Sequence, residues 1–327
     1  MTLAKVDRAS MLRSPCISRS DSAALSLGVV ICTHNRPVQL ENCLKRLMSC
    51  NLDNVSVIVA DSAPLSDAAR SISKAYAAGY VLSPLKGLSR ARNIGTRALM
   101  TDVVAYLDDD MIPCDCWSTT ILKAFSDMKV MAATGPILAT QLADASLADM
   151  RQAVAASSWG ISPKSVDRSC VDWFERTNFG GIGDGNFALR RVAFDEIDGF
   201  DNRLGRGAQI NSGEEHYAYF RLALSGHRIA YLPDAIVFHP SSTNDEEHQR
   251  RYIQEVSAYL PFLAWNHPSY SLRILKYIVE GAFGKNRPWR QNSTSTMPKI
   301  GMSSYIWSGL IGLSTFMKSV LTHSEGK

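Results

Sequence analysis

The chain has 327 residues, of which 46% are hydrophobic and 20% charged, which fits one large α/β domain or a domain with an appendage and excludes a disordered chain. The whole net charge of +4 lies in residues 241–327, which carry 10 Lys or Arg and 6 Asp or Glu, since residues 1–240 carry 25 of each. This small, scattered excess predicts no nucleic-acid-binding surface.

Seven cysteines without a CxxC pair favour reduced thiols in a cytoplasmic protein over a disulfide framework. Cys114 and Cys116 are only two positions apart and have no second thiol pair, so they do not predict a zinc site. Residues 1–25 are rich in serine and have no continuous apolar core, which predicts a flexible tail and not a secretory signal. No stretch is long and apolar enough to predict a membrane-spanning helix.

After this tail, short β-branched runs alternate with helical patterns. Strands are predicted at residues 28–33, 55–60, 80–82 and 103–107, with helices between them, the last at residues 88–99. Continuous apolar strands separated by helices are typical of a parallel, doubly wound α/β sheet that is covered on both faces. Residues 140–178 are less regular and are interpreted as a variable segment. Later elements are predicted at residues 187–190, 192–197, 215–225, 228–232 and 235–238.

Polar residues follow the predicted strands at their carboxyl ends, where open parallel sheets bind ligands. These residues are Asn35, Asp61 and the run Asp108-Asp109-Asp110. There is no GxGxxG after the first strand and no GxxxxGK[ST] motif, so a dinucleotide fold and a P-loop lose their support. A nucleotide bound here would have to be held by side chains and a metal ion.

The aspartate run is the sharpest chemical signal in the sequence. Asp108 and Asp110 are two positions apart at a strand end, so both carboxylates can face one point, where Mg²⁺ or Mn²⁺ would relieve their repulsion. The alternative is a cluster that caps the helix beginning near Trp117. Three consecutive aspartates exceed what a cap needs, so the sequence favours a metal site that binds a diphosphate.

Eight segments occur in the order seen in glycosyltransferase family 2, and they are VVICTHNRP, VIVADSAP, GLSRARNIG, VAYLDDDMIP, GDGNFALRR, GFDNRLGRG, GEEHYAYFRL and IVFHP. The sequence resembles that family over about residues 27–240. The resemblance implies a GT-A (Rossmann-like) fold with a mixed sheet, and a catalytic domain at residues 26–240. It also implies an inverting reaction in which a sugar passes from a nucleoside-diphosphate donor to a glycan or lipid-linked acceptor, as in surface polysaccharide or glycoconjugate assembly.

The resemblance also assigns donor-binding roles. It implies that Thr33, Asn35, Arg36 and Asp61 hold the nucleoside, although an aspartate at a strand end often forms an Asx-turn instead. Arg92 and Asn93 match positions near the base and the acidic run, where Arg92 could also merely neutralise the aspartates.

The remaining donor and metal assignments concern the diphosphate and the sugar. Asp108 and Asp110, with Asp109 beside them, would clamp the diphosphate through the metal ion, and His239 would complete the metal site unless it is only a strand-end histidine. Gly185 and Asn186, together with Asp184, would approach the donor sugar. Trp173 would stack on the acceptor sugar, or would be a core tryptophan.

Inversion in a single displacement requires a general base for the acceptor hydroxyl. The family usually has an aspartate preceded by glutamate there, whereas this sequence has Glu214-Glu215, so the matching residue is Glu215. The extra methylene moves the carboxylate by about 1.5 Å and leaves Glu214 as a second candidate. Acidic residues in the first turn of a helix also have a purely structural explanation, since they favour its dipole.

Residues 241–327 lie beyond the resemblance and are predicted to form a helical extension. Near its end, Ile306, Leu310, Leu313, Met317 and Val320 form one helical stripe, and small polar residues form the opposite one. Such a helix could lie peripherally on the inner face of a membrane beside a lipid-linked acceptor, or could pack its apolar stripe on the catalytic domain.

Two other functions remain open from the sequence alone. One is a nucleotidyltransferase, which shares related α/β architecture and acidic metal sites. The other is a non-catalytic relative that binds a sugar nucleotide or a membrane.

Overall fold

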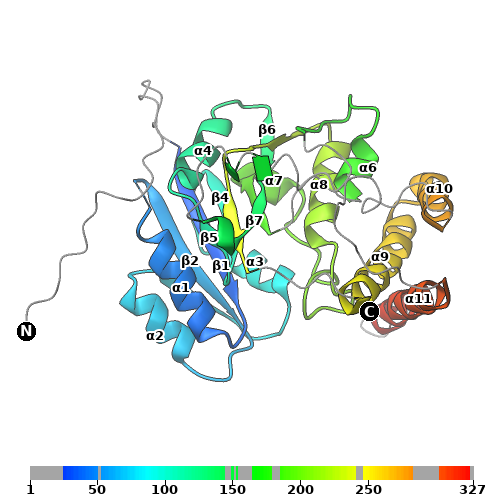
Figure 1. Cartoon of the computed structure of the whole chain (residues 1–327), viewed down its shortest axis with the longest axis horizontal. Coiled ribbons are helices and arrows are strands. Elements are labelled where there is room, and N and C mark those ends of the chain that lie inside the picture. The colour runs from blue at the N-terminus through cyan, green and yellow to red at the C-terminus, as the bar shows by residue number, and fades with distance from the viewer. Residues whose placement is uncertain are drawn as a thin grey trace, which may run out of the picture.

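The computed structural model describes residues 25–50, 53–143, 149–150, 152–153, 164–178, 185–240, 246–282 and 302–324. The predicted tail, except for Leu25, lies outside the described residues, and so does Asp184. Figure 1 shows an α/β region built around a twisted sheet, with a group of helices at one end of the molecule.

The main sheet has seven strands in the order β3-β2-β1-β4-β8-β6-β9. In that order their bounds are Gly79–Ser83, Val55–Ser62, Leu27–Thr33, Val103–Asp108, Asn186–Arg190, Val130–Thr134 and Arg228–Tyr231. β3, β2, β1 and β4 run parallel, as the continuous apolar runs predict. β8 is antiparallel to both neighbours, and β6 and β9 are parallel again, so the sheet is mixed.

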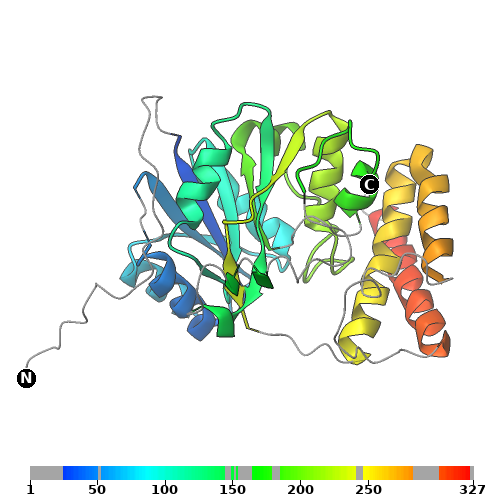
Figure 2. The ribbon, with the colours of Figure 1, turned by 45° about the horizontal axis from the view of Figure 1, so that its top comes forward.

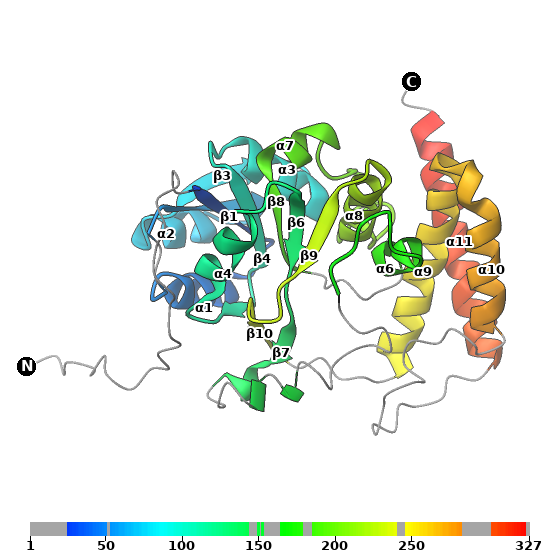
Figure 3. The ribbon, with the colours of Figure 1, turned by 90° about the horizontal axis from the view of Figure 1, so that it is seen from above.

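Helices cover both faces of this sheet (Figures 1 and 3). One apolar core joins the sheet to α1 (Pro37–Leu47), α2 (Ala68–Ala75) and α4 (Trp117–Ala124). The other joins it to α3 (Leu88–Arg97), α7 (Arg191–Glu196), α8 (Glu214–Leu224) and the short α6 (Trp173–Asn178). The doubly wound arrangement predicted from the sequence is therefore present.

A small second sheet has the strand order β5-β10-β7. Its strands are β5 (Ile112–Pro113), β7 (Ile137–Ala139, followed by the 3-10 turn η1 at Thr140–Leu142) and β10 (Val237–His239). β10 is antiparallel to β5, which follows the aspartate run almost directly. This pairing carries His239 to the aspartates, although more than a hundred residues separate them in sequence.

Among the described residues beyond position 245, the chain forms α9 (Glu246–Asn266), α10 (Ser271–Ala282, preceded by the 3-10 turn η2 at Pro268–Tyr270) and α11 (Met302–Ser324). α9 packs on the α8 side of the sheet through Tyr259 and Phe262, while α10 and α11 lie at the outer end of the molecule (Figure 2). Across the described residues, no helix combines the length and the apolarity that crossing a bilayer requires.

Helix α11 buries small residues of its polar face, while part of its apolar stripe is exposed. Ser308, Gly312 and Ser319 of the small polar face are buried, whereas Leu310 and Met317 of the apolar stripe are about half exposed, at 53% and 52%. The apolar stripe is thus only partly packed, since Val320 of the same stripe contacts the core while Leu310 and Met317 do not lie within it. Close approach of the α9 backbone explains why the face with small residues is buried, because a Cβ added at Gly312 would lie 2.3 Å from the carbonyl oxygen of Gln254.

We predict opposite effects of alanine at two glycines of α11. Gly312→Ala should destabilise the protein by about 1–3 kcal/mol, because the new methyl group meets the α9 backbone. Gly309→Ala is the matched control, since its nearest neighbour is Ser257 Oγ at 3.7 Å, and it should stabilise the helix by about 0.5–1 kcal/mol. Thermal unfolding with both variants tests this packing, and equal melting temperatures would contradict it.

Candidate active site

Three neighbouring parallel strands end together and bring the predicted site residues to one edge of the sheet. Thr33 at the end of β1 is paired in register with Asp61 of β2, and Cys32 is paired with Asp108 of β4. This is the carboxyl edge at which open sheets bind ligands.

Asp109 and Asp110 are held by a shared arginine. The Arg36 guanidinium donates to Asp109 Oδ1 at 2.7 Å and to Asp110 Oδ2 at 2.6 Å. Thr33 Oγ1 donates to the other oxygen of Asp109 at 2.7 Å, and His239 Nε2 lies 3.3 Å from Asp110 Oδ1. Asp109 is buried with both oxygens engaged, which favours a structural part for it over direct donor contact.

The surroundings of these two aspartates raise the pKa of Asp109 and lower the pKa of Asp110. Burial raises the pKa of Asp109 to about 6, even though Thr33 and Arg36 oppose the shift. Burial also acts on Asp110, but hydrogen bonds from His239 and Arg36 outweigh it and lower its pKa to about 2. Asp110 is therefore an anion throughout the physiological pH range, as a ligand for a cation must be.

A buried arginine joins the aspartate run to the predicted catalytic pair. Arg92 Nη1 lies 2.8 Å from Glu215 Oε1 and 3.1 Å from Glu214 Oε1, and its Nη2 lies 3.5 Å from Asp108 Oδ1. Arg92 is only 1% exposed, and burial alone would lower its pKa, but the three carboxylates outweigh burial and raise it. One guanidinium thus contacts both the aspartate run and the glutamate pair.

Glu214 and Glu215 begin α8 directly after Gly213, whose φ of +88° suits glycine. Both side chains are buried. Burial and the charge of Glu215 raise the pKa of Glu214 well above its usual range. Gly205 covers this pair, since a Cβ there would lie 3.0 Å from Glu214 Cδ.

Three of the four predicted nucleoside-binding residues, Asn35, Arg36 and Asp61, line a small cavity of about 20 Å³, and Thr33 does not. Asp61 Oδ2 accepts a hydrogen bond from the Tyr80 hydroxyl at 3.0 Å, and burial raises the pKa of Asp61. Asn35 has a φ of +56°, and its Oδ1 accepts from the Leu65 amide, so it shapes the turn. Tyr80 was not among the predicted site residues, because one tyrosine in a strand carries no distinguishing pattern.

Gly185 lies directly against the first aspartate. Its φ is +75°, and a Cβ there would meet Met111 Cε at 2.6 Å and Asp108 Oδ2 at 3.2 Å. Any side chain would therefore push this segment away from Asp108, which agrees with a position beside the donor.

Three residues predicted to contact the donor or the acceptor have side chains that are engaged by other parts of the protein. Asn93 exchanges two hydrogen bonds of 2.8 Å with the backbone of Phe200. Asn186 donates to the Ala235 carbonyl at 2.8 Å and accepts from Trp117 Nε1 at 2.9 Å. Trp173 is buried and stacked on Phe220, which favours the core alternative over contact with an acceptor sugar.

The predicted metal ligands fit a hard divalent cation in chemistry. Carboxylate oxygens of Asp108 and Asp110 with the imidazole of His239 are donors that Mn²⁺ and Mg²⁺ accept. Within the described part of the chain, however, no three His, Cys, Asp or Glu side chains are gathered closely enough to hold an ion. Arg36 and Arg92 instead neutralise these carboxylates, so an ion would compete with the arginines for them.

Comparison with known proteins agrees with this arrangement. A family model described as glycosyl transferase family 2 matches residues 28–197. The pre-mycofactocin glycosyltransferase of Mycobacterium tuberculosis is 28% identical over 158 residues, which are 48% of this chain and 31% of that protein. The match thus spans about a third of that curated relative's length.

Solved structures share the fold at low sequence identity. The mannosyltransferase PcManGT from Pyrobaculum calidifontis, in complex with GDP-Man and Mn²⁺, has a TM-score of 0.55 and 14% identity, covering 94% of this chain and 89% of that one. S. aureus TarS 1–349 in complex with UDP-GlcNAc has a TM-score of 0.55 and 14% identity, covering 90% and 82%.

These likenesses confirm the GT-A fold that the sequence motifs imply. Because the family model spans more than half of the residues, the chain belongs to glycosyl transferase family 2.

Proposed function

We propose that the protein is a metal-dependent, inverting glycosyltransferase that moves a sugar from a nucleoside-diphosphate donor to an acceptor hydroxyl. The observation that carries this proposal is the contact of Arg92 with Asp108 on one side and with Glu214 and Glu215 on the other. A donor-binding carboxylate and a candidate base thereby belong to one buried network. The structural relatives with GDP-Man and UDP-GlcNAc support a sugar nucleotide as the donor class.

On the donor side, Asp61, Asn35 and Arg36 would contact the nucleoside, which would lie over the small pocket that they line, since that pocket has room for only about one water molecule. Asp108, Asp110 and His239 would hold Mg²⁺ or Mn²⁺, which supplies positive charge to offset the charge that builds on the leaving diphosphate. The guanidinium of Arg36 would remain beside Asp110 as a further positive charge facing the phosphates. Gly185 lets its segment lie close to Asp108, where the donor sugar would pass.

On the acceptor side, Glu215 would remove the proton from the attacking hydroxyl as that oxygen bonds to the anomeric carbon. The bond from that carbon to the diphosphate breaks in the same displacement, so the anomeric configuration inverts. Arg92 would hold the carboxylate of Glu215 in position, since its Nη1 lies 2.8 Å from Glu215 Oε1. A glycan or a lipid-linked glycan of the cell surface is the acceptor class we propose.

We predict that Glu215→Gln abolishes transfer while leaving nucleotide binding intact. Loss of the general base should slow transfer by about 10²–10⁴-fold, since glutamine keeps the shape and loses the proton acceptor. Rates of sugar transfer, or of donor hydrolysis, measure the effect. Glu41→Gln, at an exposed position of α1, is the matched control and should keep full activity.

The same experiment separates the alternatives. A fully active Glu215→Gln variant would rule out Glu215 as the general base and leave Glu214 as the candidate. An inactive wild-type chain that still binds sugar nucleotides would identify a non-catalytic relative. Release of pyrophosphate from a nucleoside triphosphate would identify a nucleotidyltransferase.

A second prediction concerns the metal ion. A nucleoside diphosphate should raise the melting temperature of the wild-type protein more strongly with Mn²⁺ than without it, because a ligand that binds only the folded state stabilises that state. Asp110→Ala should remove this Mn²⁺-dependent increment, whereas Asp195→Ala, at an exposed position of α7, should retain it. Nucleotide binding that ignores Mn²⁺ in the wild type would refute the metal site.

We also propose that the outer end of the molecule rests on a membrane surface. Large apolar side chains are exposed there on both helices, including Leu272 and Leu275 of α10 and Trp307, Leu310 and Leu321 of α11. Burying such a surface in the interfacial region of a bilayer would be favourable and would bring the active site near a lipid-linked acceptor.

Partition with liposomes tests this contact. Replacing Leu310, Leu313 and Met317 by serine should sharply reduce the bound fraction, because all three side chains are exposed on α11. Replacing Met100, Met128 and Val171 by serine removes apolar groups that are even more exposed but lie elsewhere, and should leave partition unchanged. Equal partition of both variants and the wild type would exclude the proposed surface.

A further inference from the structure

A groove of about 950 Å³ lies beside the carboxylate network and is not part of it. One wall is the outward face of α3 with Lys86, two residues before that helix, and the other is formed by residues 197–203, residues 207–209 and α8. Neither the aspartate run nor the glutamate pair lines it. The groove therefore needs an explanation of its own.

The α3 wall carries a row of cations, Lys86, Arg90 and Arg97. Within the part of the chain that the structure describes, no ion pair joins any of the three to an acidic side chain. Arg90 and Arg97 are seven residues apart, so they share a helix face at a separation of about 10.5 Å along the axis. The side chain of Asn93 between them is committed to the backbone of Phe200.

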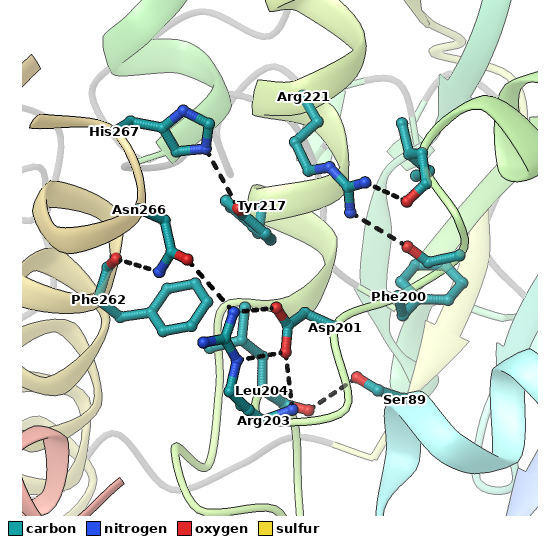
Figure 4. Close-up of polar contacts among 12 residues, drawn as sticks. Ser89, Phe200, Asp201, Arg203, Leu204, Tyr217, Arg221, Phe262, Asn266 and His267 are labelled. Carbon is teal, nitrogen blue, oxygen red and sulfur yellow. Dashed lines mark hydrogen bonds and ion pairs between the residues drawn. The ribbon is translucent and has the colours of Figure 1, made fainter. Parts of the chain in front are cut away.

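The opposite wall adds two more arginines, whose contacts are drawn in Figure 4. Arg203 is paired with Asp201 at 2.6 Å and lies over the ring of Phe262. Arg221 instead donates to the backbone carbonyls of Ile197 and Gly199, so these contacts leave its charge uncompensated. With Asp198 and Asp201 as the acids of the lining, the groove has a clear excess of positive charge.

One short loop lies between the groove and the glutamate pair. Gly205 lies against Glu214, while Gly207, two residues later, lines the groove and faces the side chain of Lys86, with its hypothetical Cβ 2.9 Å from Lys86 Cγ. On α8, Tyr217 lines the groove two residues after Glu215. Because helix residues two apart point to different sides, Tyr217 faces the groove while Glu215 does not, and the loop of Gly205 and Gly207 is what the groove and the glutamate pair share.

We propose that this groove binds an anionic acceptor, a glycan chain that carries carboxylate or phosphate groups on its units. Guanidinium groups recognise both oxyanions through paired hydrogen bonds, and the separation of Arg90 from Arg97 suits charges on different units of a chain. A neutral sugar would leave this row of cations without partners. The assignment of the ligand as the acceptor rests on the proposed glycosyltransferase function.

Direct binding to the full-length protein tests the inference without donor or turnover. The carboxylate probe is a fluorescent oligogalacturonate, its neutral counterpart is the same oligomer with methyl-esterified carboxyls, and the phosphate probe is inorganic tripolyphosphate. At least one anion should bind, more weakly as salt is added, and the methyl ester should not bind. Binding of only one anion identifies the oxyanion that the groove prefers and supports the proposal.

The double variant Arg90→Gln/Arg97→Gln should weaken anion binding by about tenfold or more, because two charge-assisted contacts are lost. Lys123→Gln/Lys129→Gln removes two charges at exposed positions at and beyond the end of α4, on the other face of the sheet, and should bind as the wild type does.

Absence of binding to both anions, equal binding of the methyl ester, or full binding by the Arg90/Arg97 variant would each overturn the proposal. None of these results affects the proposed function, which is tested separately through nucleotide binding and Glu215→Gln. Conversely, anion binding by a protein that neither binds nor cleaves sugar nucleotides would keep the groove and refute the transferase.

Discussion

The site depends on one buried positive charge. Arg92 lies beneath the carboxyl edge of the sheet among Asp108, Glu214 and Glu215, and it also packs against the aromatic rings of Phe187 and Phe200. Without that guanidinium, the buried carboxylates of Glu214 and Glu215 would face each other beside the part-exposed Asp108, a costly arrangement in a protein interior. Arg92 therefore explains how α8 can begin with two buried glutamates beside the aspartate run.

Ion pairs also balance the other carboxylates at this edge of the sheet. Arg36 compensates Asp109 and Asp110 as Arg92 compensates the other group, so each set of carboxylates has its own arginine. On the account proposed above, a metal ion and a diphosphate would enter a site whose charges are already balanced. The basic groove is the exception, since much of its positive charge has no acidic partner, and this imbalance is what points to an anionic ligand there.

Much of the fold could be predicted because buried strands leave continuous apolar runs, and because Asp61 and Asp108 follow such runs directly. The pairing of Arg92 with Glu214 could not, since 122 residues separate them and no local pattern links them. Asn186 shows a second limit, because an amide that bonds the backbone resembles one that binds a sugar. α11 shows a third: periodicity revealed two faces, but the size of Gly312, and not hydrophobicity, decided which one is buried.

The central claim is that one network joins the donor carboxylates to a base, so that the acceptor attacks opposite the leaving diphosphate. The most direct measurement is ¹H NMR of the first-formed product, using the sugar nucleotide that stabilises the protein most strongly. After an inverting displacement, the signal of the anomeric proton should show the configuration at the anomeric carbon opposite to that in the donor. A product that retains the donor's configuration would contradict it.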